Sequence, residues 1–213
     1  MNKKIVIVDY DIGNIKSIIN AFKHHNVELI LSSNKDDILS ADAVVLPGVG
    51  AFSHGMENLE KKGLVDVLKE YASKDKPFLG ICLGMQLLFS KSYEFLETKG
   101  LDIISGTVEI ITKDDNTKLP HISWNEIFTD NINLWENTIF NNIQNSSNVY
   151  FVHSYVCLPK DDSLVLSYTD YSNNKFCSAV KKGNIYGCQF HPEKSANLGL
   201  KIIKNFIEIV GKN

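Results

Sequence analysis

The sequence predicts an α/β fold: an open, mostly parallel twisted sheet flanked by helices, with antiparallel strands added in the C-terminal half. In the first half, short runs rich in Val, Ile and Leu alternate with segments whose apolar residues recur at helical spacing. In the second half, strand-like runs are separated by turn residues, and a helical pattern returns only at the end. A chain of 213 residues, 44% of them apolar, can bury one large core, so we expect one domain over residues 1–213.

The individual elements follow from these patterns. In the first half we expect strands at Lys4–Val8, Glu28–Leu31, Ala43–Leu46 and Pro77–Ile81, and helices at Asn14–His25 and Gly55–Ser73. In the second half we expect strands at Val149–Val152, Leu164–Tyr168, Ser178–Lys181 and Asn184–Gln189, with a hairpin turn at Lys182-Gly183-Asn184. A last helix is expected over Leu198–Val210, ended by Gly211, and the Asn-rich stretch 131–148 is expected to be a surface loop.

Composition narrows the class of partner. The net charge of −3 comes without long blocks of either sign, so we expect no nucleic-acid or membrane partner and favour small molecules or another protein. No apolar run reaches the roughly 18 residues that cross a bilayer, and no signal-peptide core is present, so a cytoplasmic protein is expected. The four cysteines lack metal-ligand spacing, so we expect no metal site and free thiols at Cys82, Cys157, Cys177 and Cys188.

Three informative loops follow the predicted parallel strands. Ligands of such sheets bind beyond the carboxyl ends of the strands. The first strand is followed by residues 9–14, the third by Pro47-Gly48-Val49-Gly50, and the fourth by a turn that contains Cys82. All three loops are therefore expected at one edge of the sheet.

The turn at Cys82 is typical of a nucleophile. Cys82 lies between Gly80 and Gly84, where an apolar strand gives way to a helical pattern. Glycines permit a tight strand-to-helix turn, and the free N–H groups of the following helix favour a thiolate. The sequence therefore predicts a nucleophilic cysteine rather than a buried structural one.

A thiol nucleophile needs a base, and His191 is the best candidate. Pro192 restricts the residue before it, so His191 is expected to be held in one pose just past a strand. Glu193 is expected to accept a hydrogen bond from the imidazole and orient it. The order Cys, His, Glu is that of an acyl-transfer triad.

Acyl transfer also requires N–H donors for the oxyanion that develops on the attacked carbonyl. The N–H of Leu83, at the start of the helix after Cys82, is one candidate. The other is the N–H of Val49, because the flanking Gly48 and Gly50 allow the backbone to reorient.

Three motifs together resemble the class I, triad-type glutamine amidotransferases, which have a flavodoxin-like α/β fold: residues 47–50, Gly80–Gln86 and Phe190–Ser195. Further segments resemble the glutaminase subunits of imidazole glycerol phosphate synthases: 9–17, 120–125 and 150–155. The resemblance spans nearly the whole chain. One departure is Ser123, where these subunits usually have glycine before the Trp-Asn pair.

The resemblance implies a glutaminase of histidine biosynthesis that needs no cofactor. Cys82 would attack the side-chain amide of glutamine, His191 would carry the proton and Glu193 would orient His191. Glutamine would be held by Gln86, the Gly48–Gly50 strand, Ser154 and Tyr155. The ammonia would pass to a (β/α)8-barrel cyclase, which forms imidazole glycerol phosphate and aminoimidazole carboxamide ribotide. The residues implied near the interface with this heterodimer partner are Asn14, Trp124, Tyr150 and Lys194.

Three alternatives remain open at this point. The same glutaminase chemistry could supply ammonia to a sugar-amidating partner, an alternative that Ser123 keeps open. A flavodoxin-like binding module, in which Cys82 is only structural, is disfavoured because no G-x-G-x-x-G follows the first strand. A cysteine peptidase is disfavoured because the residues around Cys82 and His191 match the amidotransferase pattern.

Overall fold

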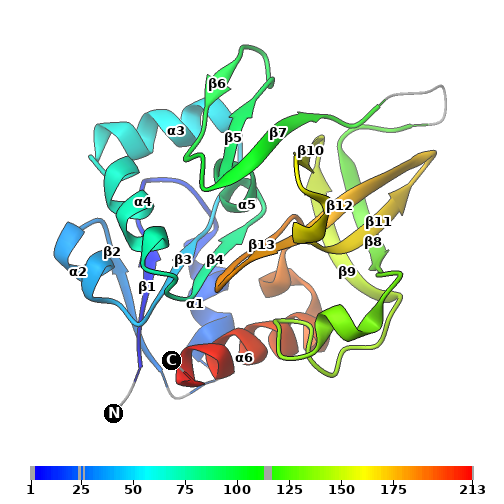
Figure 1. The fold of residues 1–213 in the computed structure, drawn as a ribbon. Coiled ribbons are helices and arrows are strands. Elements are labelled where there is room, and N and C mark those ends of the chain that lie inside the picture. The colour runs from blue at the N-terminus through cyan, green and yellow to red at the C-terminus, as the bar shows by residue number, and fades with distance from the viewer. Residues whose placement is uncertain (1–2, 24, 26, 113–116, 213) are drawn as a thin grey trace.

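The computed structural model describes residues 3–23, 25, 27–112 and 117–212. Within these residues, eleven strands form one mixed sheet with helices on both faces (Figure 1). Its first part is parallel and its second part largely antiparallel. The predicted fold class is therefore confirmed.

The parallel part contains five strands, which lie side by side in the order β2 (Glu28–Ser32), β1 (Lys4–Val8), β3 (Ala43–Leu46), β4 (Phe78–Ile81) and β13 (Ile185–Cys188). The strands β1, β3, β4 and β13 are buried almost throughout. Burial on both faces explains why these strands read as continuous apolar runs rather than as an alternating pattern. The last of them, β13, comes from the far end of the chain and pairs with β4.

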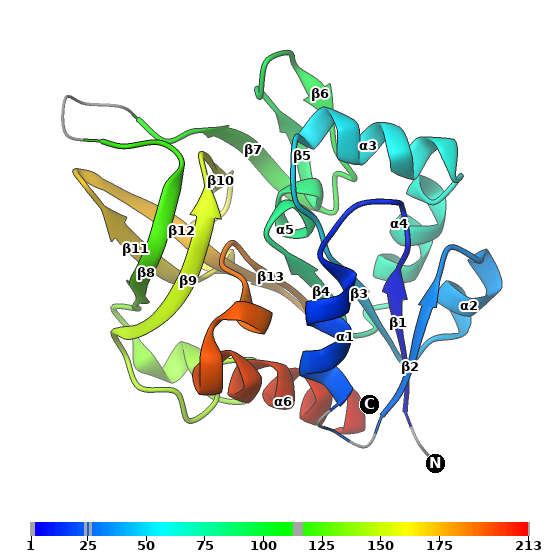
Figure 2. The ribbon, with the colours of Figure 1, turned by 180° about the vertical axis from the view of Figure 1, so that it is seen from behind.

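Helices cover both faces of this parallel part. On one face lie α2 (Lys35–Ser40), α3 (Phe52–Lys61) and α4 (Val65–Ser73), whose apolar residues share a core cluster with Val6 and Val8. On the other face, α1 (Ile15–Lys23) packs beside α6 (Ala196–Lys212), and both share a second cluster with Ile5 and Ile7 (Figure 2). The alternation of side chains along β1 thus divides the core into two layers.

The second part of the sheet continues from β13 through β12 (Asn174–Lys182), β10 (Tyr155–Pro159), β7 (Ile104–Ile110), β5 (Phe89–Ser92) and β6 (Thr98–Lys99). Strand β11 (Val165–Tyr171) pairs with β12, and a separate two-stranded sheet is formed by β8 (His121–Ile127) and β9 (Ser147–His153). Short helical turns are α5 (Leu83–Leu87), η1 (Ile132–Trp135), η2 (Asp162–Leu164) and η3 (Pro192–Lys194). The predicted hairpin at Gly183-Asn184 joins β12 to β13.

The single helix expected over Gly55–Ser73 is wrong, because two helices occupy this stretch. Gly63 has φ +65°, its N–H bonds to the Glu60 carbonyl, and the N–H of Leu64 bonds to the Leu59 carbonyl. This pair of bonds is the Schellman motif, which ends a helix at a left-handed glycine. The apolar residues keep their helical spacing across the break, which is why periodicity alone missed it.

Two further expectations need correction. The last helix does not end before Gly211 but runs through it to Lys212. The Asn-rich stretch 131–148 is not merely a surface loop, because Trp135 and Phe140 are buried in the second core cluster. The first helix is found as α1, and His24, in its predicted range, lies outside the described residues.

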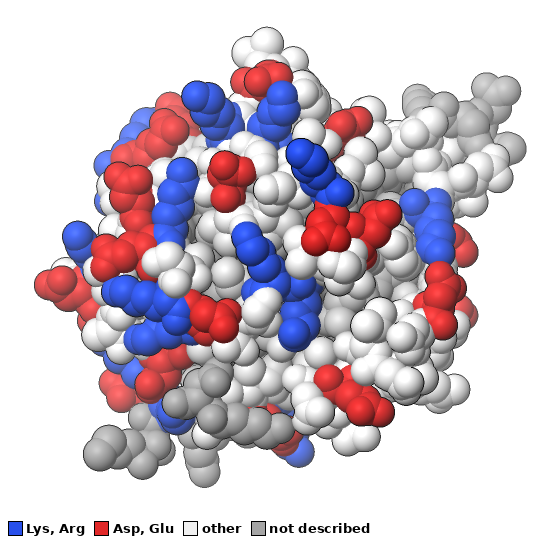
Figure 3. Space-filling view, viewed as in Figure 1, with Lys and Arg blue, Asp and Glu red and all other residues white. Residues whose placement is uncertain are grey.

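The surface carries both signs of charge. Figure 3 shows basic side chains interspersed with acidic ones on the face that it presents. Among the described residues, no helix is long and apolar enough to cross a membrane.

Candidate active site

Cys82 sits at the sharp turn between β4 and α5. Its φ of 54° and ψ of −110° lie in a region that non-glycine residues rarely adopt. Its N–H bonds to the Cys188 carbonyl at 2.8 Å, and its side chain is only slightly exposed. Such strain at a strand-to-helix turn is typical of a nucleophile held for reaction.

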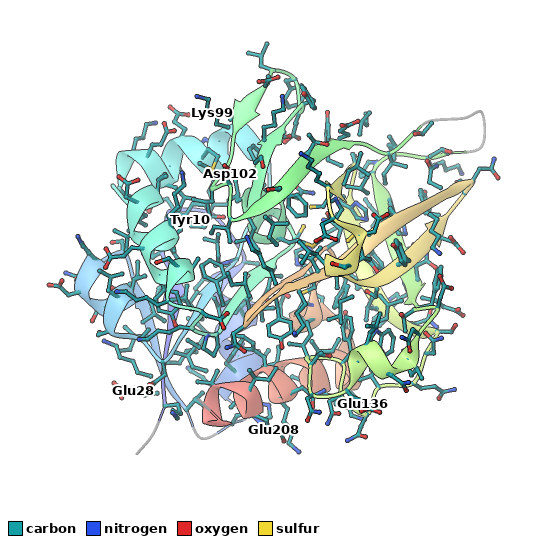
Figure 4. All side chains as sticks on the ribbon, in the orientation of Figure 1. Tyr10, Glu28, Lys99, Asp102, Glu136 and Glu208 are labelled. Atoms are coloured by element: carbon teal, nitrogen blue, oxygen red, sulfur yellow. The ribbon has the colours of Figure 1, made fainter. Side chains whose placement is uncertain are left out.

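The segment 46–48 packs directly on this turn. A Cβ atom on Gly84 would overlap the Leu46 carbonyl, and one on Gly48 would lie 2.6 Å from the Tyr10 hydroxyl. Tyr10, labelled in Figure 4, is fully buried and donates to the Pro47 carbonyl at 2.5 Å. Burial, with a smaller effect of Cys82, raises the pKa of this hydroxyl, so it remains a donor. Tyr10 therefore ties the predicted oxyanion segment to the strand-one loop.

The structure brings His191 and Glu193 together with Cys82. His191 lies just past β13, the strand paired with β4, and begins the turn η3. Its Nδ1 lies 2.8 Å from Glu193 Oε1, and both side chains are almost fully buried. A carboxylate only accepts, so Nδ1 carries a proton and Nε2 is the nitrogen left for Cys82.

The pKa of His191 is set by its burial and by two neighbouring groups, Cys82 and Glu193. Burial alone would lower the pKa of His191, but the Cys82 sulfur and the Glu193 carboxylate raise it to about 10. His191 Nε2 is buried and makes no standard hydrogen bond to any described residue. The three other cysteines are free, and burial raises the pKa of each: Cys157, Cys177 and Cys188. High pKa values leave these thiols protonated and unreactive.

Backbone contacts hold the histidine turn against β9. The N–H of His191 bonds to the Tyr150 carbonyl at 2.9 Å. The buried Ser195 hydroxyl donates to the His191 carbonyl at 2.7 Å and accepts from the Tyr150 N–H at 3.0 Å. Ser195 thus fixes the turn that carries the base.

A cavity of about 610 Å³ opens beside Cys82. Of the residues predicted to bind substrate or stabilise the oxyanion, those that line it are Val49, Gly50, Leu83, Gln86, Ser154 and Tyr155. Gly48 lies beneath, against Tyr10 and Leu83. Leu83 is the first residue of α5, so its N–H is not used within the helix.

Hydrogen bonds fix the orientation of the Gln86 amide. Gln86 Nε2 donates to the Tyr155 carbonyl at 3.1 Å and to Gln189 Oε1 at 3.0 Å. Gln189 Nε2 in turn lies 3.8 Å from the Cys82 sulfur. Because a carbonyl only accepts, the nitrogen of Gln86 must face Tyr155, which leaves its oxygen as the acceptor for a ligand.

The four residues predicted near a partner interface lie close to one rim. The rings of Trp124 and Tyr150 meet edge to face with centroids 6.1 Å apart, and Lys194 Nζ lies 5.9 Å from the Tyr150 centroid. Trp124 is about half exposed (51%), and Lys194 also lines the cavity. Asn14 is exposed just before α1, and α1 packs against η3, which carries Lys194.

Residues at the site that were missed from the sequence include Tyr10, Glu94, His153, Gln189 and Ser195. Glu94 lines the cavity and accepts from the Phe52 N–H at 2.6 Å. Gln189 and Ser195 flank the histidine motif, and Tyr10 follows the first strand, so proximity to these motifs was the available signal. Nothing in the sequence around Glu94 indicated a site.

Comparisons with known proteins identify the family. The family described as glutamine amidotransferase class-I matches residues 6–210. The chain is 49% identical over 211 residues to imidazole glycerol phosphate synthase subunit HisH of Pelagibacter ubique, covering 96% of this chain and 99% of the relative. It is 43% identical over 210 residues to subunit HisH 1 of Legionella pneumophila, with the same coverage.

Solved structures share the fold at low identity. A crystal structure of a glutamine amidotransferase has TM-score 0.73 at 17% identity and covers 97% of this chain and 98% of its own. PurLQS from Thermotoga maritima has TM-score 0.71 at 18% identity, with coverage of 98% and 99%. The full-length relatives and the family match together show that the chain belongs to the class-I glutamine amidotransferases, within the group of imidazole glycerol phosphate synthase HisH subunits.

Proposed function

We propose that this chain is the glutamine-hydrolysing subunit of an imidazole glycerol phosphate synthase in histidine biosynthesis. The observation that carries the proposal is the buried grouping of Cys82, His191 and Glu193 beside the cavity. The full-length relatives named HisH support the pathway. The alternative of a sugar-amidating partner is not favoured by these relatives. That residues 1–213 form one such domain is supported by the family match over 6–210, and a cytoplasmic location stays a prediction from the sequence.

The proposed reaction begins with attack of the Cys82 sulfur on the side-chain amide carbon of glutamine. The N–H groups of Leu83 and Val49 stabilise the oxyanion. His191 passes the proton to the departing nitrogen, the C–N bond breaks, and ammonia leaves a γ-glutamyl thioester. Water, deprotonated by His191, then hydrolyses the thioester to glutamate and regenerates the thiol.

Substrate binding is proposed to use the polar groups that line the cavity. The Gln86 oxygen is left as an acceptor, and the Glu94 carboxylate suits the ammonium group of an amino acid. Ser154 and Tyr155 lie on the same wall. We propose that ammonia passes to a (β/α)8-barrel cyclase docked over Asn14, Trp124, Tyr150 and Lys194, because ammonia in bulk water is protonated and loses its nucleophilicity.

The test is to mix the pure chain with a cyclase subunit, its ribotide substrate and glutamine, and to measure glutamate and imidazole glycerol phosphate together. Equal release of both products is expected. Cys82→Ala should abolish glutamate release, because Cys82 carries the only thiol among the described residues that line the cavity. Glutamate release by Cys82→Ala at the wild-type rate would show that Cys82 takes no part in the reaction. Glutamate release by the wild type without imidazole glycerol phosphate would show that the cyclase is not the ammonia acceptor.

A further inference from the structure

Two buried histidines and Ser123 form a chain of hydrogen bonds that reaches the cavity wall at His153. His121 Nε2 lies 2.8 Å from Ser123 Oγ, and His121 Nδ1 lies 3.2 Å from His153 Nε2. His153 Nδ1 lies 3.0 Å from the Tyr155 carbonyl oxygen. Both imidazoles are buried, so these contacts replace water as hydrogen-bond partners.

Only one arrangement of protons satisfies every contact. The Tyr155 carbonyl only accepts, so His153 Nδ1 carries a proton and donates to it. Burial holds the pKa of His153 at about 3, and burial lowers the pKa of His121 to about 4, so both rings are neutral near pH 7. His153 Nε2 must then accept from His121 Nδ1, and His121 Nε2 must accept from the Ser123 hydroxyl.

Packing holds the His121 ring in position, so only the placement of the protons can vary along these hydrogen bonds. The His121 ring stacks on both Phe151 and Tyr171, with ring centroids 5.0 and 3.9 Å away. The Tyr155 carbonyl sets the direction of these hydrogen bonds, because a proton on His121 Nε2 would leave two lone pairs facing each other between His121 and His153. The Ser123 hydroxyl can donate or accept, so it turns to donate to His121 Nε2 in this arrangement. Without the hydroxyl, His121 Nε2 would lose this partner, and the arrangement in which His153 donates to Tyr155 would be less stable.

The chain ends on a group that shapes the substrate pocket. The Tyr155 carbonyl accepts from both His153 Nδ1 and Gln86 Nε2, using its two lone pairs. Gln86 continues through Gln189 toward the Cys82 sulfur. The Tyr155 carbonyl and Gln189 thus orient the Gln86 amide, and the hydrogen bonds that begin at Ser123 hold the Tyr155 carbonyl in place.

We infer that Ser123 is a positioning residue for glutamine binding, acting through the Ser123–His121–His153 hydrogen-bond chain on the Tyr155 carbonyl and the Gln86 amide. The inference rests on the proposed glutamine hydrolysis.

The test compares variants of the full chain, assayed with its cyclase partner. Ser123→Ala and Ser123→Gly remove the donor, and Ser123→Thr keeps it on a residue suited to a strand. Asn125→Ala is the matched control: Asn125 lies two residues on along β8 and bonds to the Asp170 carbonyl, outside the histidine chain. Thermal unfolding of each variant separates misfolding from altered positioning.

Two measurements decide the outcome. Nitrogen-15 NMR of the wild-type imidazoles should show protons on Nδ1 of both His121 and His153, and Ser123→Ala should lose this single arrangement at His121. The KM for glutamine should rise about 3- to 10-fold in Ser123→Ala and Ser123→Gly, more than kcat falls, because one partly buried hydrogen bond is lost. Ser123→Thr and Asn125→Ala should stay near wild type.

A proton on His153 Nε2 in the wild type would overturn the inference. So would Ser123→Ala with unchanged imidazole signals and unchanged KM, or a rise in KM of Asn125→Ala equal to that of Ser123→Ala. If the wild type with its partner released no glutamate, the proposed function itself would fall, and that result is distinct from any difference among the variants.

Discussion

Cys82 shows how a single residue depends on its neighbours for its conformation. A positive φ at a residue with a side chain costs about 1–3 kcal/mol, and here φ is 54°. The turn is held by the bond from the Cys82 N–H to Cys188 and by the close packing of Gly84 under Leu46. The strain is therefore balanced by contacts of the surrounding residues, which keep the sulfur at the cavity wall.

The roles of His191 and Glu193 predict unequal losses of activity. His191→Ala removes the group that carries the proton and should lower kcat for glutamate release by about 10³-fold or more. Glu193→Gln keeps a hydrogen-bond partner near Nδ1 but removes the charge, so a loss of about 10- to 100-fold is expected. Steady-state kinetics with the cyclase partner measures both, and equal rates for the two variants and the wild type would contradict the assignment.

His153 predicts a loss of stability in mild acid. Its pKa is about 3 in the folded chain and near 6.5 in the unfolded chain. Below about pH 6.5 the unfolded state therefore binds more protons than the folded state, and the unfolding free energy decreases as the pH is lowered. From pH 7 to pH 5 this residue should account for about 1–2 kcal/mol of lost unfolding free energy.

Urea unfolding at pH 7, 6 and 5 measures this effect in the wild type and in His153→Asn, which keeps a donor near the Nδ1 position. The variant should show a shallower decline between pH 7 and 5. Asn125→Ala is the control, because Asn125 lies on β8, the strand paired with β9, and its side-chain amide does not titrate. A slope in His153→Asn equal to that of the wild type would refute the prediction.

At the scale of elements, the sequence predicted best what local patterning decides. The four parallel strands of the first half and the hairpin at Gly183 were found from apolar runs and turn residues. The break at Gly63 was missed because apolar spacing continues through it, and the helix was wrongly ended at Gly211 because glycine can also adopt the right-handed helical conformation. Local sequence does not distinguish these two states of glycine.

The residues of the site likewise fall into those that short sequence motifs predict and those that only the fold brings together. Cys82, His191 and Glu193 were predicted because strained turns and proline leave short motifs in the sequence. The hydrogen bonds that orient them come from residues far away in the chain: Tyr10 to Pro47, Gln86 to Gln189 and Ser195 to Tyr150. These contacts are set by sheet topology, which brings β13 beside β4, and no local pattern reports them.

The junction between β4 and α5 predicts a large effect of a small substitution. In Gly84→Ala the new methyl group would overlap the Leu46 carbonyl, which is backbone and cannot step aside. Unfolding free energy should fall by about 2–4 kcal/mol. Gly211→Ala is the control, since its Cβ would meet open space in α6, and it should stabilise the chain by a few tenths of a kcal/mol up to about 1 kcal/mol. Denaturant unfolding measures both, and equal effects of the two substitutions would contradict this packing argument.

At the scale of the whole molecule, the expected docking surface and the turn that carries His191 both involve strand β9. Tyr150 offers its ring to Trp124 on the outside, while its backbone bonds to His191 and Ser195 on the inside. Lys194 lies in η3 itself, immediately after Glu193. A partner that presses on Trp124 and Lys194 therefore contacts elements that also hold the base, which gives docking a short route to the catalytic residues.

The resemblance to glutaminase subunits predicts that the isolated chain hydrolyses glutamine slowly and that the acceptor-loaded cyclase raises the rate strongly, as expected if an oxyanion donor in the 47–50 segment has to reorient. Trp124→Ala should weaken binding of the cyclase by about tenfold or more, since a half-exposed tryptophan at the centre of an interface commonly dominates its affinity. Leu31→Ala is the control, because Leu31 is comparably exposed but lies on β2, at the far edge of the sheet. Titration of labelled cyclase measures both affinities, and glutamate release is followed in parallel. Full activity of the chain alone would rule out gating by the partner, whereas equal affinities of the two variants would move the docking surface away from β8 and β9.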